Sequence, residues 1–87
     1  MYSLEVRESV DRIFFKLAKK NPKQMRIIDK KIKQILENPH HFKPLRAPMQ
    51  HLRRVHIDKS FVITYSVDEQ NEIVVIEDYD HRDNVYI

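Results

Sequence analysis

Five side chains in the second half of the chain belong to types that carry out acid–base and phosphate chemistry. They are Arg54, His56, His81, Arg82 and Tyr86. An imidazole accepts or donates a proton near neutral pH, and a guanidinium binds two phosphate oxygens at once. Such a set can cleave RNA without a metal ion, by deprotonating a 2′-hydroxyl, stabilising charge on the attacked phosphate and protonating the departing 5′-oxygen. We take these residues as the candidate catalytic set.

This chemistry requires two separate segments to meet. Arg54 and His56 lie in a predicted strand, whereas His81, Arg82 and Tyr86 follow the last predicted strand. The C-terminal segment must therefore fold back along the sheet. Simpler interpretations stay open: the first two residues can be ordinary solvent-facing strand residues, and His81 and Arg82 can end a strand or bind a partner. Tyr86 is next to last in the sequence, where fraying is common.

A second feature is the concentration of positive charge in residues 16–33. The chain has 16 Lys and Arg against 13 Asp and Glu, a formal net charge of +3, and this segment contains a single acid, Asp29. It forms either a solvated helix face or a surface for RNA phosphates. The residues expected to contact RNA are Lys19, Lys20, Lys23, Arg26 and Lys30, with Arg53 from the predicted strand.

The composition excludes several classes of protein. Without glycine there is no glycine-rich phosphate loop of the P-loop or Rossmann type, and without cysteine there is no disulfide or thiolate metal site. His40 and His41 are adjacent and lack a clear carboxylate partner, and Asp78, Asp80 and Asp83 fit a solvated turn, so we expect no metal and no cofactor. No apolar run approaches the roughly 20 residues that cross a bilayer, and the N-terminus does not resemble a signal peptide. We expect a cytoplasmic location.

The first half of the chain predicts one short strand and two helices. Residues 2–6 alternate weakly, as a short edge strand does. Asn21 and Pro22 then separate two amphipathic helices as N-cap and first helical residue, and Asn38 before Pro39 ends the second. The apolar stripes are Val10, Ile13, Phe14, Leu17 and Ala18 in the first helix and Met25, Ile28, Ile32, Ile35 and Leu36 in the second.

The second half predicts a loop followed by three strands. Residues 40–49 contain Pro44 and Pro48 and follow Pro39, as in a loop, and Phe42 and Leu45 are expected to plug into the core. The strands are expected at residues 52–57, 61–67 and 73–76, the last reaching residue 79 at most, joined by short turns. Residues 1–87 are therefore predicted to form one α+β domain. Its parts are a short N-terminal strand, a helical hairpin and a three-stranded antiparallel meander, with the helices packed on one face.

The alternation of apolar and polar residues assigns the two faces of this sheet. The residues expected to face the helices are Val55, Ile57, Phe61, Ile63, Tyr65 and Val67. The residues expected on the other side, the open face, are Leu52, Arg54, His56, Val62, Thr64 and Ser66. The third strand is apolar on both sides, which predicts a central position.

Three segments carry a resemblance to a known family. Lys43-Pro44-Leu45-Arg46, residues 52–57 and residues 61–67 resemble the central segments of the RelE/ParE toxin superfamily, and residues 75–86 resemble its C-terminal His-Arg…Tyr signature. The resemblance covers essentially the whole chain. It implies a compact RelE-like α+β fold and a cognate acidic antitoxin as partner. In the RelE branch it also implies a toxin that cuts mRNA on the ribosome and so inhibits translation.

The resemblance assigns the candidate set by position. Arg54 and His56 fall where RelE members often place basic residues, and His81, Arg82 and Tyr86 match the C-terminal signature. One position departs from it: Val62 stands where many active members carry an arginine. Two other functions therefore stay open, a ParE-like protein that inhibits gyrase without cleaving anything and a degenerate relative that only binds its antitoxin. The C-terminal set favours the nuclease, and Val62 favours the alternatives.

Overall fold

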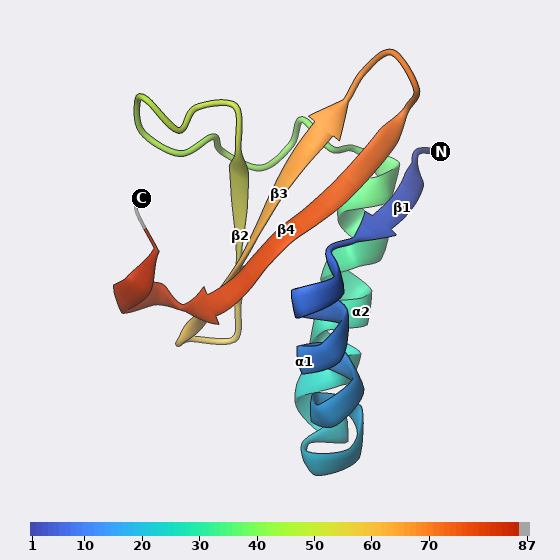
Figure 1. Ribbon diagram of the computed structural model, residues 1–87, viewed down its shortest axis with the longest axis vertical. Coiled ribbons are helices and arrows are strands. Elements are labelled where there is room, and N and C mark those ends of the chain that lie inside the picture. The colour runs from blue at the N-terminus through green and yellow to red at the C-terminus, as the bar shows by residue number, and fades with distance from the viewer. Residues whose placement is uncertain (86–87) are drawn as a thin grey trace.

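The computed structural model describes residues 1–85, and Figure 1 shows two helices packed beside a twisted sheet. The elements in chain order are β1 (Ser3–Val6), α1 (Glu8–Lys20), α2 (Pro22–Glu37), β2 (Arg53–Ile57), β3 (Phe61–Asp68), β4 (Ile73–His81) and a 3-10 turn (Arg82–Asn84). The predicted α+β class and element order are confirmed. The strand β4 is longer than predicted, because it continues to His81 rather than ending by residue 79.

The sheet has the order β1-β4-β3-β2. β2, β3 and β4 form the predicted antiparallel meander, and β1 adds to β4 in parallel with Val6 opposite Ile76. β1 is thus the expected edge strand, and the apolar β4 is central, as its sequence predicts. In a chain without glycine, Asp58 (φ 56°) and Glu72 (φ 54°) take the left-handed backbone conformation in the two hairpin turns.

One residue separates the two helices. The Asn21 backbone N–H donates to the Leu17 carbonyl (2.7 Å), and its side-chain oxygen accepts from the Gln24 backbone N–H (3.1 Å). Pro22 follows as the first residue of α2, where its missing N–H costs nothing. Asn38 ends α2 before Pro39 by donating to the Gln34 carbonyl. The predicted helical hairpin is therefore built by local capping.

The core lies between the helical hairpin and one face of the sheet (Figure 1). It consists of Val10 and Phe14 from α1, Ile28, Ile32 and Ile35 from α2, and Val55, Ile57, Ile63, Tyr65, Val74, Ile76 and Tyr79 from the strands. Phe42 packs against this cluster from the loop, as predicted. Burying these side chains removes apolar surface from water and is the main driving force for folding.

The open face is not open along its whole length. Val62 is 0% exposed and Thr64 5%, although the alternation predicts that both face away from the helices. The loop after α2 and the C-terminal segment both reach this face. Leu45 is buried outside the main core, its backbone N–H donates to the Leu52 carbonyl (2.9 Å), and it lines a hollow together with Thr64, Asn84 and Val85. Leu45 is thus buried as predicted, but it lies outside the main core cluster, on the opposite face of the sheet.

A β-bulge interrupts the pairing of β3 with β4. Thr64 pairs with Asp78 and Tyr65 with Ile76, so Glu77 is an extra residue in β4. Its carboxylate accepts from the Ser66 hydroxyl (2.7 Å) and from Nε of Arg7 (2.8 Å), the residue that precedes α1. The hydrogen bond from Arg7, together with that from Ser66, lowers the pKa of Glu77 although partial burial opposes this. The bulge thus joins the start of α1 to the sheet.

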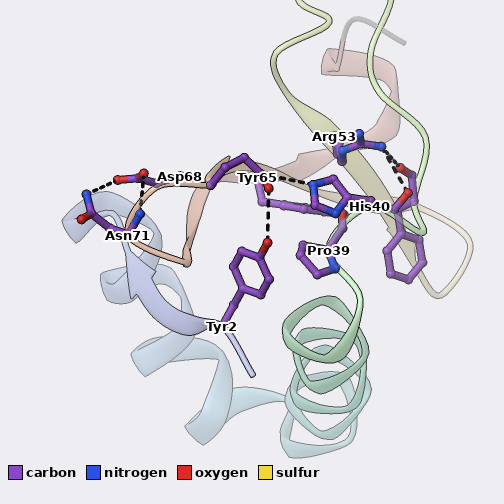
Figure 2. A network of polar contacts seen from close by, with 9 residues as sticks. Tyr2, Pro39, His40, Arg53, Tyr65, Asp68 and Asn71 are labelled. Carbon is purple, nitrogen blue, oxygen red and sulfur yellow. Dashed lines mark hydrogen bonds and ion pairs between the residues drawn. The ribbon is translucent and has the colours of Figure 1, made fainter.

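Two polar side chains hold the segment that follows α2 (Figure 2). The buried Tyr65 hydroxyl donates to the Pro39 carbonyl (2.7 Å), and Arg53 Nη1 donates to the carbonyls of Phe42 (2.6 Å) and His40 (3.4 Å). These carbonyls belong to neither a helix nor a strand, and the two side chains supply the donors that regular structure would otherwise provide. The predicted core position of Tyr65 is confirmed, and burial raises the pKa of its hydroxyl to about 12.

Replacing Tyr65 by Phe removes this donor without changing the ring. We expect the free energy of unfolding at pH 7 to fall by about 1–2 kcal/mol, because the Pro39 carbonyl loses its partner in a buried site. Wild type should also lose stability as the pH rises from 10 to 12, since the unfolded state ionises at the ordinary pKa of 10.0 and the folded state near 12. Tyr65→Phe should lose less stability than wild type over this range, and the loss that remains should come from Tyr2 and Tyr79, whose pKa values are also raised in the folded protein. Urea unfolding between pH 7 and 12 tests both, with Tyr2→Phe, which removes an exposed hydrogen bond to Glu69, as control.

Replacing Glu77 by Gln tests the bulge contact. A carboxylate whose pKa is lowered on folding contributes stability above its ordinary pKa of 4.5, and this contribution disappears as the pH falls. The Glu77 side chain is 23% exposed, so we expect Glu77→Gln to lower the free energy of unfolding by about 1 kcal/mol at pH 7. The difference from wild type should shrink below pH 4. The control is Glu5→Gln, at an exposed position of β1. An equal loss at pH 7 and pH 3 would contradict this account.

Candidate functional site

Arg54 and His56 lie on β2 and point to the open face, as predicted. Strand register places Arg54 in a row with Thr64 and Asp78, and His56 in a row with Val62 and Asp80. Each row runs from a basic residue at the sheet edge, over a buried neutral residue, to a carboxylate on β4. The open face is therefore basic along β2 and acidic along β4.

The two residues differ in how they are held. Arg54 is half-buried, its Nη1 donates to the Pro44 carbonyl (3.1 Å), and its backbone N–H donates to the Lys43 carbonyl (3.1 Å). His56 is exposed. Among residues 1–85, no ion pair with a carboxylate involves either side chain. Arg54 is thus a positioned cation with free donors, beside an imidazole in contact with solvent.

Arg53 points to the opposite side of β2. One of its guanidinium nitrogens is used for the carbonyls of the segment after α2, and its strand position pairs it with Tyr65. The contact is visible in Figure 2. Its main observed role is structural, and its contact with RNA stays a prediction. The five helical residues predicted to contact RNA, Lys19, Lys20, Lys23, Arg26 and Lys30, are all exposed.

His81 and Arg82 lie where β4 ends. His81 pairs with Phe61, and its ring meets the Phe61 ring edge-on at 5.7 Å, while Phe61 stacks on Tyr79 at 5.1 Å. His81 Nδ1 accepts from the Asp83 backbone N–H (3.2 Å). These contacts place His81 on the side of Phe61 and Tyr79, opposite to His56. Arg82 is exposed, and its backbone N–H donates to the Ser60 carbonyl (2.8 Å).

The candidate catalytic set is therefore divided into two pairs within residues 1–85. Arg54 and His56 share one face of the sheet, and His81 and Arg82 lie at its end, with His81 on the other face. The two pairs flank the same end of the sheet, because His56 is opposite Val62 and His81 is opposite its neighbour Phe61. Tyr86 lies outside the described residues. The catalytic roles of all five stay predictions.

Two hollows adjoin these residues. One, of about 250 Å³, lies on the open face and includes Leu45, Met49, Thr64, Glu77 and Asp78 in its lining. The other, of about 530 Å³, lies beside the outer edge of β2. It is lined by Lys31, His41, Phe42, Lys43, Arg54, Val55 and His56. The first has carboxylates in its wall and the second has cations and imidazoles. An anionic ligand therefore fits the second hollow.

Sequence reasoning missed the second hollow as a site. It treated Lys31 as part of a solvated helix surface and His41 as part of a loop. No local pattern joins these residues to Arg54, since they come from α2, the following loop and β2. In the part of the chain that the structure describes, no three His, Cys, Asp or Glu side chains are grouped so as to hold a metal ion. Nor is any helix among residues 1–85 long and apolar enough to cross a membrane.

Comparison with known proteins identifies the family. Residues 1–86 match the family described as "ParE toxin of type II toxin-antitoxin system, parDE". An uncharacterised protein of Methanosarcina mazei is 57% identical over 86 residues, which is 99% of this chain and 100% of that protein. A protein of Methanocaldococcus jannaschii named "Putative toxin RelE4" is 49% identical over 86 residues, covering 99% of this chain and 92% of that protein.

Solved structures agree on the fold. A chain of the RelBE2 toxin–antitoxin complex from Mycobacterium tuberculosis superposes with a TM-score of 0.74 at 22% identity, covering 93% of this chain and 98% of that one. At this identity the similarity concerns the fold, and it confirms the RelE-like arrangement that the sequence predicts. The family match extends over nearly all of the chain. The protein therefore belongs to the ParE toxin family and is a toxin of a type II toxin–antitoxin system, within the RelE/ParE superfamily.

Proposed function

We propose that this toxin is a ribosome-dependent mRNA endonuclease, which inhibits translation by metal-independent attack of a 2′-hydroxyl on the adjacent phosphate. The observation that carries the proposal is the pair Arg54 and His56, a positioned cation beside an exposed imidazole, neither in an ion pair among residues 1–85. Support also comes from the relative that bears the RelE name at 49% identity.

Different residues of the candidate catalytic set would carry out different steps of RNA cleavage. An imidazole at His56 can take or return a proton, and the guanidinium groups of Arg54 and of Arg82, whose Nε lies 4.0 Å from Oδ1 of Asp83, can stabilise the charge on the attacked phosphate. An RNA strand that crosses the end of the sheet at the β2–β3 turn passes both His56 and His81. The 2′-hydroxyl and the leaving oxygen lie on opposite sides of the phosphate, so two proton-transfer groups on the two sides of this end suit the reaction. Tyr86 is the further group that the family resemblance implies.

The proposed partners follow from charge. A cognate acidic antitoxin would bind the basic surface of the toxin and fold as it binds. The exposed cations of the hairpin, Lys19, Lys20, Lys23, Arg26 and Lys30, would contact ribosomal RNA. The reaction needs no cofactor, and a ribosome that translates mRNA in the cytoplasm supplies the substrate.

A separate observation favours a second candidate function. Val62 is 0% exposed, so the position where many active RelE members carry an arginine is filled by a buried apolar side chain. This favours a ParE-like protein that inhibits gyrase without catalysis, or a degenerate relative that only binds its antitoxin. The family description, which names ParE, agrees with the former.

Primer extension on mRNA from a translation reaction, with and without ribosomes, tests the nuclease. We expect cuts inside codons only when ribosomes are present. Arg54→Gln, His56→Gln and Arg82→Gln should each lower the cleavage rate by about 10²–10⁴-fold, the usual effect of removing a proton-transfer or charge-stabilising group. Arg12→Gln, at an exposed position of α1, is the control for a lost positive charge, and circular dichroism checks the fold.

Two outcomes would contradict the proposal in different ways. Intact mRNA in the presence of ribosomes, together with inhibition of DNA supercoiling by purified gyrase, would establish the ParE-like function instead. Cleavage that survives in all three variants would keep the nuclease but reject these residues as its catalytic group.

A further inference from the structure

The hollow beside β2 gathers positive charge from three separate elements. Lys31 comes from α2 and is half-buried, Lys43 comes from the loop, and Arg54 comes from β2. None of its lining residues is acidic. Within residues 1–85, none of these three cations is in an ion pair with a carboxylate. Because like charges repel, this grouping costs stability unless an anion joins it.

The interior of the hollow is apolar and partly aromatic. Phe42 and Val55 belong to its lining, and the exposed His41 ring meets the Phe42 ring edge-on at 5.0 Å and 82°. One face of the imidazole is therefore free to stack with a flat heteroaromatic group. A volume of about 530 Å³ exceeds what an amino-acid side chain fills. Cations around an aromatic interior are the combination that single-stranded nucleic acids use, with phosphates on the cations and a base on the ring.

The edge of β2 supplies polar groups to the same hollow. The Arg54 backbone N–H donates outward to the Lys43 carbonyl, and backbone groups two residues apart in a strand point to the same side. The N–H and C=O of His56 therefore also face outward, next to the hollow that His56 lines. A donor and an acceptor at this position can hydrogen-bond to the edge of a base.

We propose that this hollow is an RNA subsite that holds one nucleotide of a single strand. Its base stacks on His41 beside Phe42, and its flanking phosphates bind Lys31, Lys43 and Arg54. The subsite adjoins His56, so a nucleotide held here would fix the position of the next phosphate along the open face. This rests on the proposed function for its choice of RNA, but it requires binding only and no cleavage. A flat base accounts for the aromatic interior, which an acidic peptide would leave unused.

Fluorescence anisotropy tests the subsite with a labelled single-stranded octaribonucleotide whose sugars are 2′-O-methylated, so that no cleavage can occur. The full chain is titrated without ribosomes at several salt concentrations. The double variant Lys31→Gln, Lys43→Gln is compared with Lys33→Gln, Arg46→Gln. Both pairs combine one residue of α2 with one outside the helices, and both remove two positive charges, but the second pair lies outside the hollow. Thermal unfolding by circular dichroism checks that all proteins fold.

We expect the subsite variant to bind RNA about tenfold or more weakly, with the slope of log K against log salt reduced by about 1.4, or about 0.7 for each lost phosphate contact. The control variant should stay within about twofold of wild type. His41→Ala should weaken binding about 5-fold or more through lost stacking, and an abasic oligonucleotide should remove this difference.

Three results would overturn the subsite. Equal weakening by both double variants would mean that RNA binds the overall charge of the protein and not this hollow. Unchanged RNA binding with loss of binding to a labelled hexaglutamate peptide would assign the hollow to an acidic peptide. A His41→Ala effect that persists with the abasic strand would reject base stacking. Loss of RNA binding in the subsite variant alone, with no mRNA cleavage by wild type, would uphold the subsite and reject the nuclease.

Discussion

Two carbonyl groups that follow α2 are satisfied by side chains, and much of this structure depends on these hydrogen bonds. Pro39 is buried and Phe42 is half-buried, and neither belongs to a helix or strand, so their oxygens would lose water without gaining a partner from regular structure. Tyr65 and Arg53, which face each other across β2 and β3, supply the donors. The chain is therefore held against the sheet at the point where it leaves the helices.

This one segment packs against both faces of the sheet. Phe42 packs on the helix side, and Leu45, only three residues later, is buried on the other side, where it lines a hollow with Thr64. The chain passes around the edge of β2 between these two residues, and Arg54 holds it there through the carbonyls of Lys43 and Pro44. The same passage creates the hollow that contains Lys31, Lys43 and Arg54. Residues that hold this segment in place, such as Arg54, thus also form the candidate binding site.

Charge on the open face is divided between its two sides. Basic groups lie along β2, and Glu77, Asp78 and Asp80 lie along β4. The carboxylate of Glu77 is compensated by Arg7, whereas Arg54 and His56 have no such partner in residues 1–85. A polyanion is therefore attracted to the β2 side and repelled from the β4 side. One fold can serve a nuclease or a binding inhibitor, so such local features, and not the fold, separate the two functions.

Local sequence was sufficient for the elements and their order. The apolar periodicity of both helices, the caps at Asn21 and Asn38, the period-two strands and the inward position of Tyr65 are properties of neighbouring residues, and each was confirmed. The family resemblance added the RelE-like fold. The burial of Val62 and Thr64 could not be read from alternation, because alternation assigns a face of the sheet and not what packs on it; beside Thr64 these are Leu45 and Val85, both distant in sequence.

The position of His81 shows most clearly what the sequence alone could not predict. Ile76 faces the helices, so regular alternation along β4 would place residue 81 on the open face, beside His56. The extra residue at Glu77 reverses this alternation, so that Tyr79 and His81 follow Ile76 on the side of the helices. A bulge depends on how β4 fits β3 and on the contacts of Glu77 with Arg7 and Ser66, which no local pattern contains. Sequence alone identified the residues whose types can carry out acid–base and phosphate chemistry, and tertiary structure decided which of them share a face.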